Sequence, residues 1–458
     1  MLFHTWSFFA FFTVAYLVYL LVKGTRLRLP WLLVISYFFY AWLSPLYLIP
    51  LVYATVVDYF VTGRIEKSRR KGAWLALSII NNLAVLGFFK YSKFIAENVN
   101  VLLSLLGASL AVPAPGILLP AGLSFYLLQS VGYAIDVYRG DVQREKSFLT
   151  YAAFVSFFPR LLAGPIERAN HILPQLRVNT PISMRDFTDG LSIFVVGYFK
   201  KVALADYLAL YVAKVYGAPR EFQAPALLLA TFLFAWQIYF DFSGYTDMAR
   251  GIARMMGLRL MLNFNNPYLS LSMGDFWRRW HISLSSWFRD YVYIPLGGNR
   301  QGKLATYRNV FVTMVLSGLW HGAAWTFVLW GAVHALGNFT TRELERTSFY
   351  AQKVPAVAKQ LFVLGFVTFA WIFFRAPSIS DAWTIVGRIF TSGLANPYCP
   401  LLALGLIVAV WAYEYIFESR VQWLLEARIV RLGLVILMIG YIIMTVPAEG
   451  QPFIYMQF

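Results

Sequence analysis

Long apolar runs separated by short polar segments dominate the sequence. The first run covers residues 6–22, contains no charged residue, and is followed by Lys23, Arg26 and Arg28. Because a membrane-crossing helix needs about 20 mostly apolar residues, this run predicts a transmembrane helix. The basic residues follow the run instead of preceding it, and no small-residue cleavage site comes after it. This order is typical of a retained membrane helix and not of a removed signal peptide.

Further apolar runs predict membrane helices along the whole chain. They cover residues 31–43, 45–61, 73–89, 99–112, 117–135, 148–163, 191–204, 225–240, 309–329, 361–374, 401–416 and 429–445. Several runs are too short to span a bilayer, and the run at 148–163 ends at Gly164-Pro165, which predicts a broken or re-entrant helix buried in protein. The pattern therefore predicts an all-α integral membrane protein of about 11 transmembrane helices, forming one polytopic domain over residues 1–458.

Basic residues concentrate in two of the segments between apolar runs. Residues 23–28 carry three basic side chains, and residues 64–71 carry five, opposed only by Glu66. The two segments are separated by two predicted membrane passes, so they lie on the same side of the membrane. Since cytoplasmic loops carry an excess of Lys and Arg, both are predicted to be cytoplasmic and the N-terminus to lie outside.

Composition agrees with a membrane location. Hydrophobic residues make up 59% of the chain and charged residues only 13%, against about 25% charged in soluble domains. This argues against a soluble enzyme, a nucleic-acid-binding domain and a disordered protein, and the formal net charge of +17 is assigned chiefly to cytoplasmic loops. The single cysteine, Cys399, allows neither an internal disulfide nor a multi-cysteine zinc site.

The segment 272–308 interleaves tryptophan with arginine. Trp277, Arg278, Arg279 and Trp280 are consecutive, and His281 follows them directly. Indole and guanidinium groups both settle at the membrane–water interface, so this segment predicts an interfacial anchor helix on the cytoplasmic side. The histidine within it is not explained by anchoring.

His321 is the strongest candidate for chemistry. It lies 12 residues after the start of the apolar run at 309–329, so in a single helix it would sit roughly 18 Å into a core of about 30 Å. A neutral imidazole is well suited to accept a proton near pH 7. A histidine that only hydrogen-bonds a neighbouring helix is an equally good interpretation of its position. No His-x-x-x-His or cysteine spacing surrounds it, so no metal site is predicted.

Five aspartates fall in or near the apolar runs, where an ionisable side chain is costly and often functional. Four of them have basic residues nearby in sequence, as Asp58 has Arg64, which predicts ion pairs or helix-end positions; these four are Asp58, Asp136, Asp206 and Asp247. The fifth, Asp241, begins the polar run of residues 241–245, which suits a water-filled cavity. Asp241 is therefore predicted to contact substrate.

Several of these motifs resemble the membrane-bound O-acyltransferase family, and in particular its bacterial alginate O-acetylation branch. The resemblance rests on Phe276-Trp277-Arg278-Arg279-Trp280-His281-Ile282-Ser283-Leu284 and on Ser317-Gly318-Leu319-Trp320-His321-Gly322. Further blocks lie at residues 87–91, 122–126, 135–140, 163–166, 199–202, 239–245, 287–300, 371–376 and 453–458. They run from the first third of the chain to its last residue. Met456 and Ala54 depart from the family pattern, and both lie outside the two motifs that contain the histidines.

The resemblance implies a multi-span helical bundle around a central tunnel that meets the family's essential histidine, which corresponds to His321. The family's second histidine corresponds to His281. The resemblance also implies that an acyl group passes from a cytosolic thioester, with acetyl-coenzyme A as the natural donor, through the protein toward exported polysaccharide. Periplasmic acyltransferase subunits are the implied partners, the bacterial inner membrane is the implied location, and no bound cofactor and no nucleic acid are implied.

On this basis His321 is expected to act as general base on the acceptor hydroxyl, with His281 orienting the donor. Trp320, Trp325 or backbone N–H groups are candidate oxyanion donors. Four basic residues could attract donor phosphates, although a purely topological role explains each of them as well: Arg278, Arg279, Lys200 and Lys201. Three alternatives remain open: D-alanyl transfer to teichoic acid, acylation of cellulose or another polymer, and a transporter.

Overall fold

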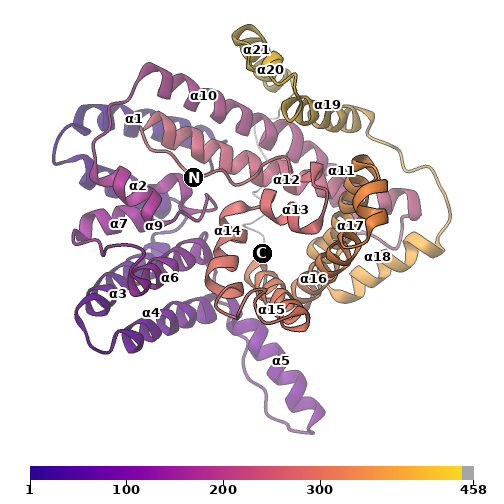
Figure 1. Cartoon of the computed structure of the whole chain (residues 1–458), viewed down its shortest axis with the longest axis horizontal. Coiled ribbons are helices and arrows are strands. Elements are labelled where there is room, and N and C mark those ends of the chain that lie inside the picture. Colours follow the sequence, from indigo (N-terminus) through magenta and orange to yellow (C-terminus); the bar gives the residue numbers. More distant parts are fainter. Residues whose placement is uncertain (446–458) are drawn as a thin grey trace. The chain divides into compact units, whose positions relative to one another are not determined.

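A computed structural model describes residues 1–445 of the chain, and over these residues every regular element is helical (Figure 1). The prediction of an all-α protein is confirmed for this part. The C-terminal block at residues 453–458 lies outside the described residues.

The chain divides into two compact units. The first unit comprises residues 1–191 and 249–261. Its helices are α1 (Trp6–Val22), α2 (Arg28–Ala41), η1 (Pro45–Tyr47), α3 (Leu48–Lys67), α4 (Lys71–Leu86), η2 (Gly87–Tyr91), α5 (Ser92–Leu105), α6 (Leu123–Arg139), α7 (Phe148–Ser156), α8 (Phe158–Leu161) and α9 (Ala169–Arg177). The prediction of one polytopic domain stays a prediction, because two compact helical units can belong to one membrane domain.

Within the described residues, the second unit comprises residues 192–248 and 262–445. Helix α10 (Met184–Phe199) enters it from the first unit, and α12 (Ala224–Met255) leaves it for the first unit. Its other helices are η3 (Lys200–Ala205), α11 (Asp206–Gly217), η4 (Pro267–Leu269), α13 (Met273–Arg279), α14 (Ile282–Phe288), η5 (Arg289–Tyr293), α15 (Lys303–His321), α16 (Trp325–Glu345), η6 (Phe349–Lys353), α17 (Ala356–Arg375), α18 (Ile379–Thr391), α19 (Leu401–Phe417), α20 (Trp423–Glu426) and α21 (Arg428–Thr445).

Four helical stretches in the described residues are long and apolar enough to cross a membrane. They are Pro45–Lys67, Lys71–Leu105, Ala224–Met255 and Ala356–Arg375. Three shorter apolar helices accompany them: Trp6–Val22, Arg28–Ala41 and Leu401–Phe417. Many of the large apolar side chains on these helices are exposed, as expected of surfaces that face lipid, for example Leu21 at 80% and Leu401 at 77%.

Two predicted runs differ from the observed helices. The runs at 73–89 and 99–112 form parts of one 35-residue helical stretch, Lys71–Leu105, that passes through the π-helical segment η2. This stretch ends at Leu105, before the prolines at 113, 115 and 120. By contrast, the predicted break in the run at 148–163 is confirmed, because α7 and α8 are separated at Phe157, two residues before Pro159.

In the first unit, helices α3, α4 and α6 pack together around a buried carboxylate. The Asp58 side chain is fully buried and accepts hydrogen bonds from the Ser78 hydroxyl at 2.6 Å and from the Asn82 amide at 2.8 Å. The predicted ion pair between Asp58 and Arg64 is therefore wrong. A carboxylate buried among helices is stabilised by neutral donors that reach it, and the sequence does not reveal which neighbouring helix supplies them.

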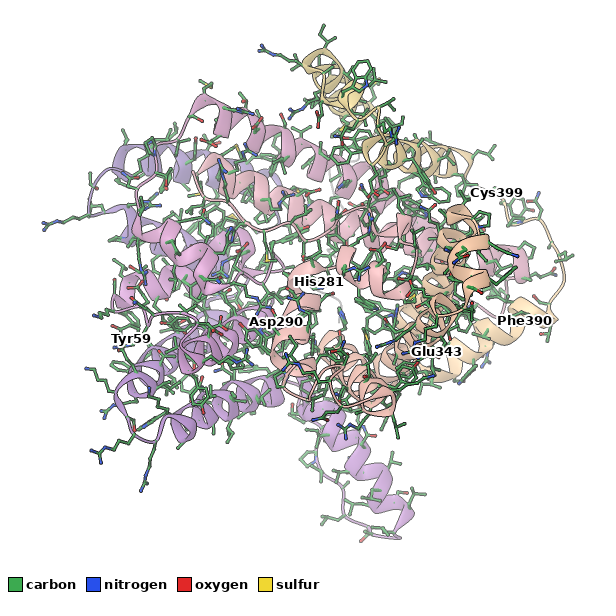
Figure 2. The ribbon with its side chains drawn as sticks, viewed as in Figure 1. Tyr59, His281, Asp290, Glu343, Phe390 and Cys399 are labelled. Carbon is green, nitrogen blue, oxygen red and sulfur yellow. The ribbon has the colours of Figure 1, made fainter. Side chains whose placement is uncertain are left out.

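The predicted single helix at 309–329 is wrong, because the chain turns back at residues 322–324. Helix α15 ends at His321 and α16 begins at Trp325, so the two form a helical hairpin. At its open end the Lys303 ammonium pairs with the Glu343 carboxylate at 2.7 Å (Figure 2 labels Glu343). His321 therefore lies at the end of a helix, at the tip of the hairpin, and not in the middle of a span.

Glycines bring the two helices of the hairpin into close contact. A β-carbon added to Gly318 would overlap the carbonyl oxygen of Phe327, and one added to Gly331 would overlap that of Met314. Small residues at such crossings let helix backbones approach closely, as is common between membrane helices. The glycines near His321 are thus required by packing.

Substituting Gly318 by alanine is expected to lower the thermal stability of the purified protein. Alanine favours a helix by about 1 kcal/mol over glycine, but the clash with the Phe327 backbone should cost about 1–3 kcal/mol. Gly365→Ala in α17 is the matched control, because a β-carbon there meets nothing within 4 Å. A Gly318→Ala protein as stable as the Gly365→Ala protein would contradict the close packing.

Candidate active site

Two histidines from distant parts of the sequence come together in the second unit. The ring centres of His281 and His321 are 6.4 Å apart, and Trp320 lies near both, at 5.9 Å from His281 and 4.9 Å from His321. The exposed fractions of His281, His321 and Trp320 are 0%, 4% and 5%. Three of the residues predicted from sequence thus form one buried cluster, the imidazole cluster, which we define as His281, His321 and Trp320.

His321 is the last residue of α15, and aromatic rings surround it. Besides Trp320, its ring has an edge-on contact with Trp330 of α16 at 5.1 Å and with Phe374 of α17 at 5.3 Å. The chain can turn directly after it because Gly322 has no side chain: a β-carbon there would overlap the Phe327 ring. The C-terminal end of a helix carries partial negative charge, which favours a cation at this position.

His281 occupies the break between α13 and α14 in a strained backbone conformation (Figure 2). Its φ of 44° and ψ of 54° are left-handed, a region that non-glycine residues adopt at a cost and often at functional sites. The following residues hold it there: the Ile282 N–H donates to the Asn263 carbonyl at 2.9 Å, and the Ser283 hydroxyl donates to the Asn263 side chain at 2.9 Å.

The surroundings of His281 keep its ring neutral. The Phe242 ring of α12 contacts it edge-on at 4.7 Å. Burial lowers the pKa of the imidazole to about 3, so His281 is uncharged near pH 7. A neutral imidazole both donates and accepts a hydrogen bond, which suits a residue that orients another group.

A third histidine is separated from the imidazole cluster by a single side chain, that of Trp330. His334 of α16 is fully buried, and its ring lies 4.5 Å from Trp330 and 5.0 Å from Trp277. Trp330 contacts both His321 and His334. The sequence motifs indicated no role for His334 and did not single out Trp330 or Phe374 individually. Their one available signal was the proximity of Trp330 and His334 to the His321 motif in sequence.

The prediction that the Trp/Arg segment forms one interfacial helix is wrong. It consists of the short helices α13 and α14 with His281 between them, followed by η5. Its tryptophans are buried, with exposed fractions of 8% for Trp277 and 1% for Trp280, and Trp280 packs on Trp371 at 5.1 Å. An alternation of Trp and Arg is compatible with a lipid interface and with an aromatic core, and packing decides between them.

Three other predicted site residues are exposed or partly exposed. Arg278 is exposed and pairs with Asp275 at 3.4 Å. Arg279 pairs with Asp275 at 3.3 Å and with Glu418 at the end of α19 at 2.5 Å. Trp325, at the start of α16, is 54% exposed. Their predicted roles in donor binding and oxyanion stabilisation stay predictions.

Asp241 belongs to a buried cluster of charges. The Lys201 ammonium lies 2.8 Å from the Asp241 carboxylate and 2.8 Å from that of Asp206, and Lys201 is 2% exposed. The neighbouring Lys200 pairs with Asp247 at 2.8 Å. The ion pair predicted between Asp206 and a nearby lysine is confirmed, and Asp241 shares that lysine. For Asp247 the sequence indicated Arg250, which follows it, and the structure pairs it with Lys200, 47 positions away. Asp241 directly precedes Phe242, the residue that packs on His281.

For the acyl transfer that the sequence resemblance implies, we expect His281→Ala to reduce the rate about 10- to 100-fold, since one lost hydrogen bond to a reacting group costs about 1.4–2.8 kcal/mol. Asparagine tolerates the left-handed backbone and retains hydrogen-bonding groups, so His281→Asn should retain more activity than His281→Ala. His281→Gly is the control that removes backbone strain together with the imidazole. Initial transfer rates at equal protein levels provide the measurement, and wild-type activity in His281→Gly would exclude a role for the ring.

The described residues contain no group of three or more His, Cys, Asp or Glu side chains that could hold a metal ion. The side chains of the imidazole cluster offer proton transfer. Two imidazoles can exchange protons with a substrate, and indole rings can exclude water around them.

The apolar helices define a helical integral membrane protein, and the buried histidine pair is its candidate acid–base site. The sequence model of the membrane-bound O-acyltransferase family matches residues 143–380. A probable alginate O-acetylase, AlgI, of Pseudomonas aeruginosa is 40% identical over 86% of this chain and 75% of its own. The chain belongs to the membrane-bound O-acyltransferase family and is an O-acyltransferase.

Two other relatives are named for different activities. A peptidoglycan O-acetyltransferase of Helicobacter pylori is 36% identical over 86% of this chain and 81% of its own. A teichoic acid D-alanyltransferase of Streptococcus thermophilus is 29% identical over 47% of this chain and 55% of its own. The likeness to O-acetyl-transferring relatives is thus higher in identity and covers more of both chains.

Proposed function

We propose that this protein moves an acetyl group from a cytosolic thioester donor across the bacterial inner membrane for O-acetylation of an exported polysaccharide such as alginate. The observation that carries the proposal is the buried His281–His321 pair, set 6.4 Å apart among tryptophans. The 40% identity to a probable alginate O-acetylase supports the choice of acetyl group and polymer.

In the proposed reaction His321 acts as general base. Its imidazole takes the proton of the acceptor hydroxyl while the hydroxyl oxygen attacks the thioester carbonyl carbon. The tetrahedral intermediate then collapses, the C–S bond breaks, and the thiolate leaves as the thiol after taking the proton back from the imidazolium. The C-terminal end of α15 stabilises the transient positive charge on His321.

His281 orients the donor in this proposal. It is neutral and buried, so it can hydrogen-bond a carbonyl or a thiol without introducing a charge. Trp320, which lies near both histidines, excludes water from the reacting atoms and is a candidate donor to the oxyanion, as is Trp325.

The donor is proposed to be acetyl-coenzyme A or another acyl thioester, with no bound cofactor. Among the residues considered for its phosphates, Arg278 is the most accessible, whereas Arg279, Lys200 and Lys201 are each engaged in ion pairs with lower exposure. Asp241, bonded to Lys201, is proposed to act through the position of α12.

The topology is proposed to comprise about 11 membrane segments, with the N-terminus outside and the basic loops at 23–28 and 64–71 in the cytoplasm. Periplasmic acyltransferase subunits are proposed to receive the acetyl group and complete its transfer to the polymer. The exported polysaccharide and membrane lipid are its other proposed partners, and no nucleic acid is proposed to bind.

Mass spectrometry of surface polysaccharide from cells with and without the gene tests the function. Loss of O-acetyl groups without loss of polymer is expected. Incubating the purified protein with radiolabelled acetyl-coenzyme A separates an enzyme from a transporter, because a transporter leaves the thioester intact. Unchanged acetylation in the deleted strain would refute the proposed acceptor class.

Peptidoglycan is the second candidate acceptor, favoured by the relative in Helicobacter pylori that matches 86% of this chain. The same deletion strain distinguishes the two acceptors if O-acetyl groups are measured separately in purified peptidoglycan and in secreted polysaccharide. D-alanyl transfer is less well supported, because its relative matches only 47% of this chain.

A further inference from the structure

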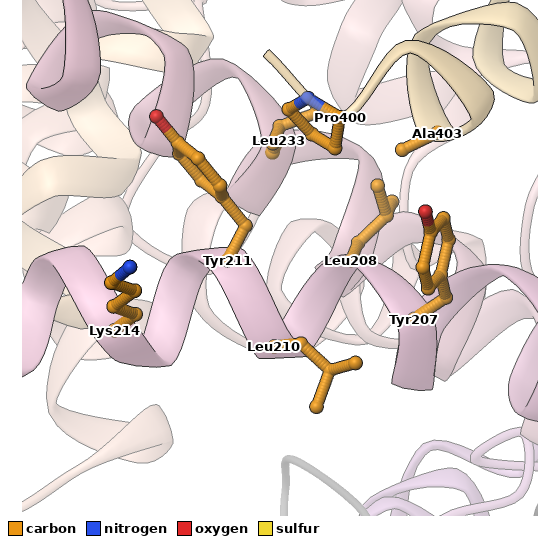
Figure 3. Close-up of a pocket in the computed structure, with 8 residues that line it drawn as sticks. All are labelled: Tyr207, Leu208, Leu210, Tyr211, Lys214, Leu233, Pro400 and Ala403. Carbon is orange, nitrogen blue, oxygen red and sulfur yellow. The ribbon is translucent and has the colours of Figure 1, made fainter. Parts of the chain in front are cut away.

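A cavity of about 250 Å³ lies in the second unit, between α11 and the start of α19 (Figure 3). It holds the volume of about eight water molecules at roughly 30 Å³ each. It shares no lining residue with the imidazole cluster. The proposed acyl transfer makes no use of it.

The wall of the cavity is apolar. Leu208 and Leu233 are 2% and 0% exposed, and Ala403 is 3% exposed. At the other wall the Tyr211 hydroxyl donates to the Pro397 carbonyl at 2.6 Å, which fixes the loop before α19 beside the cavity. A cavity with this lining favours a hydrocarbon chain over a polar ligand.

One end of the cavity carries a positive charge. Tyr207, Tyr211 and Lys214 are spaced i, i+4 and i+7 along α11, so they lie on one face of the helix (Figure 3). Lys214 is exposed, in the last turn of α11. No carboxylate of the described residues forms an ion pair with it, so its charge is available to a ligand.

The place of Lys214 in the sequence matches the depth of lipid headgroups. It comes shortly before the polar segment 218–223, which leads into the long apolar helix α12. The opposite wall includes Pro400 and Ala403, at the start of the apolar helix α19, whose Leu401 and Leu402 are 77% and 53% exposed. Ends of apolar helices lie near the bilayer phosphates, so the Lys214 end of the cavity is expected at headgroup depth.

From these features we propose that the cavity binds one anionic phospholipid, with an acyl chain along Leu208, Leu233 and Ala403 and the phosphate at Lys214. A transmembrane helix of a partner protein is too wide for this space, because a helix with side chains is about 10–12 Å across. The hydrocarbon wall and the cation at one end match the two parts of a lipid. This site is independent of the proposed acyl transfer.

Native mass spectrometry of the full-length protein, purified in detergent and incubated with phosphatidylglycerol or phosphatidylcholine, tests the proposal. The wild type is expected to retain phosphatidylglycerol in preference to phosphatidylcholine. Lys214→Ala should lower this preference about fivefold, since one basic residue at a membrane surface contributes about that factor. Lys353→Ala, which removes an exposed lysine outside the cavity, is the matched control and should leave the preference unchanged.

A second variant tests the hydrocarbon part of the site. Ala403→Phe fills the cavity, so it should abolish retention of both lipids while Lys214 stays in place. Equal retention of the two lipids by the wild type would overturn the proposal. An unchanged lipid preference in Lys214→Ala would also overturn it. Lipid retention by Ala403→Phe together with loss of a co-purifying membrane protein would overturn it too, because that result would identify the cavity as a protein contact.

Discussion

Replacing His321 by alanine is expected to reduce acyl transfer by about 10²–10⁴-fold, the usual contribution of a general base. His321 is 4% exposed at the end of α15, close to His281 and enclosed by three aromatic rings. No other imidazole occupies the same position, so water would have to take the proton. The measurement is the O-acetyl content of the exported polymer, normalised to the amount of protein in the membrane.

Two variants separate catalysis from packing at His321. His321→Gln keeps a polar side chain of similar length but cannot act as a base near pH 7, so it should be as inactive as His321→Ala. His171→Ala removes a half-exposed histidine of the first unit that bonds Glu167 and serves as the matched histidine control. Normal acetylation by His321→Ala at wild-type protein levels would remove His321 from the mechanism.

Replacing Lys201 by methionine is expected to destabilise the protein by about 3–5 kcal/mol. The ammonium of Lys201 bonds two carboxylates, those of Asp206 and Asp241, at 2.8 Å each. Without it, two negative charges would remain close together in the interior of the second unit, and their desolvation would not be offset. The effect is measured by heating the purified protein and recording the temperature at which its monodisperse peak in size-exclusion chromatography is lost.

The charge balance itself is tested by combining substitutions. In the triple variant Lys201→Met, Asp206→Asn, Asp241→Asn the charges are removed together, so part of the lost stability should return. Lys353→Met is the matched control, because Lys353 is exposed at the end of η6 in the same unit and belongs to no ion pair in the described chain. A Lys201→Met protein with wild-type thermal stability would mean that the cluster contributes nothing to folding.

Activity of the Lys201 variants should follow the position of α12. Asp241 directly precedes Phe242, whose ring lies 4.7 Å from His281. Lys201→Met, which loses the ion pair with Asp241, is therefore expected to have a lower maximal rate than Lys201→Arg. The comparison is made at temperatures where both variants are folded. Since arginine keeps the charge, partial rescue by Lys201→Arg identifies a positioning role for the ion pair.

Local patterns predicted the helices well where a helix ends at a charge or a proline. The run at 6–22 matches α1, and the break in the run at 148–163 appears at Phe157, shortly before Pro159. The hairpin at 322–324 was missed because Gly322-Ala323-Ala324 is apolar and contains no proline. The turn arises from contacts between α15 and α16, where Phe327 occupies the space that a side chain at Gly322 would need.

The sequence predicted which histidines belong to the candidate site, but it did not predict how they are arranged in space. His281 and His321 stand 40 positions apart, and only the packing of α13, α14 and α15 brings their rings within 6.4 Å. Trp277 and Trp280 were assigned to a lipid interface, yet they pack in the aromatic core of the second unit. Large aromatic side chains suit both environments, because their partners are equally apolar in each.

The sequence by itself determined that this protein is helical, that it is a membrane protein, and which histidines are candidates for the active site. These properties follow from hydrophobicity, charge density and residue type, which are local and additive along the chain. Only the tertiary structure decided that His321 ends a helix, that His281 is strained and neutral, and that Lys201 bridges Asp206 and Asp241. Those properties depend on which distant side chains are buried together, because burial sets both the cost of a charge and the partner that offsets it.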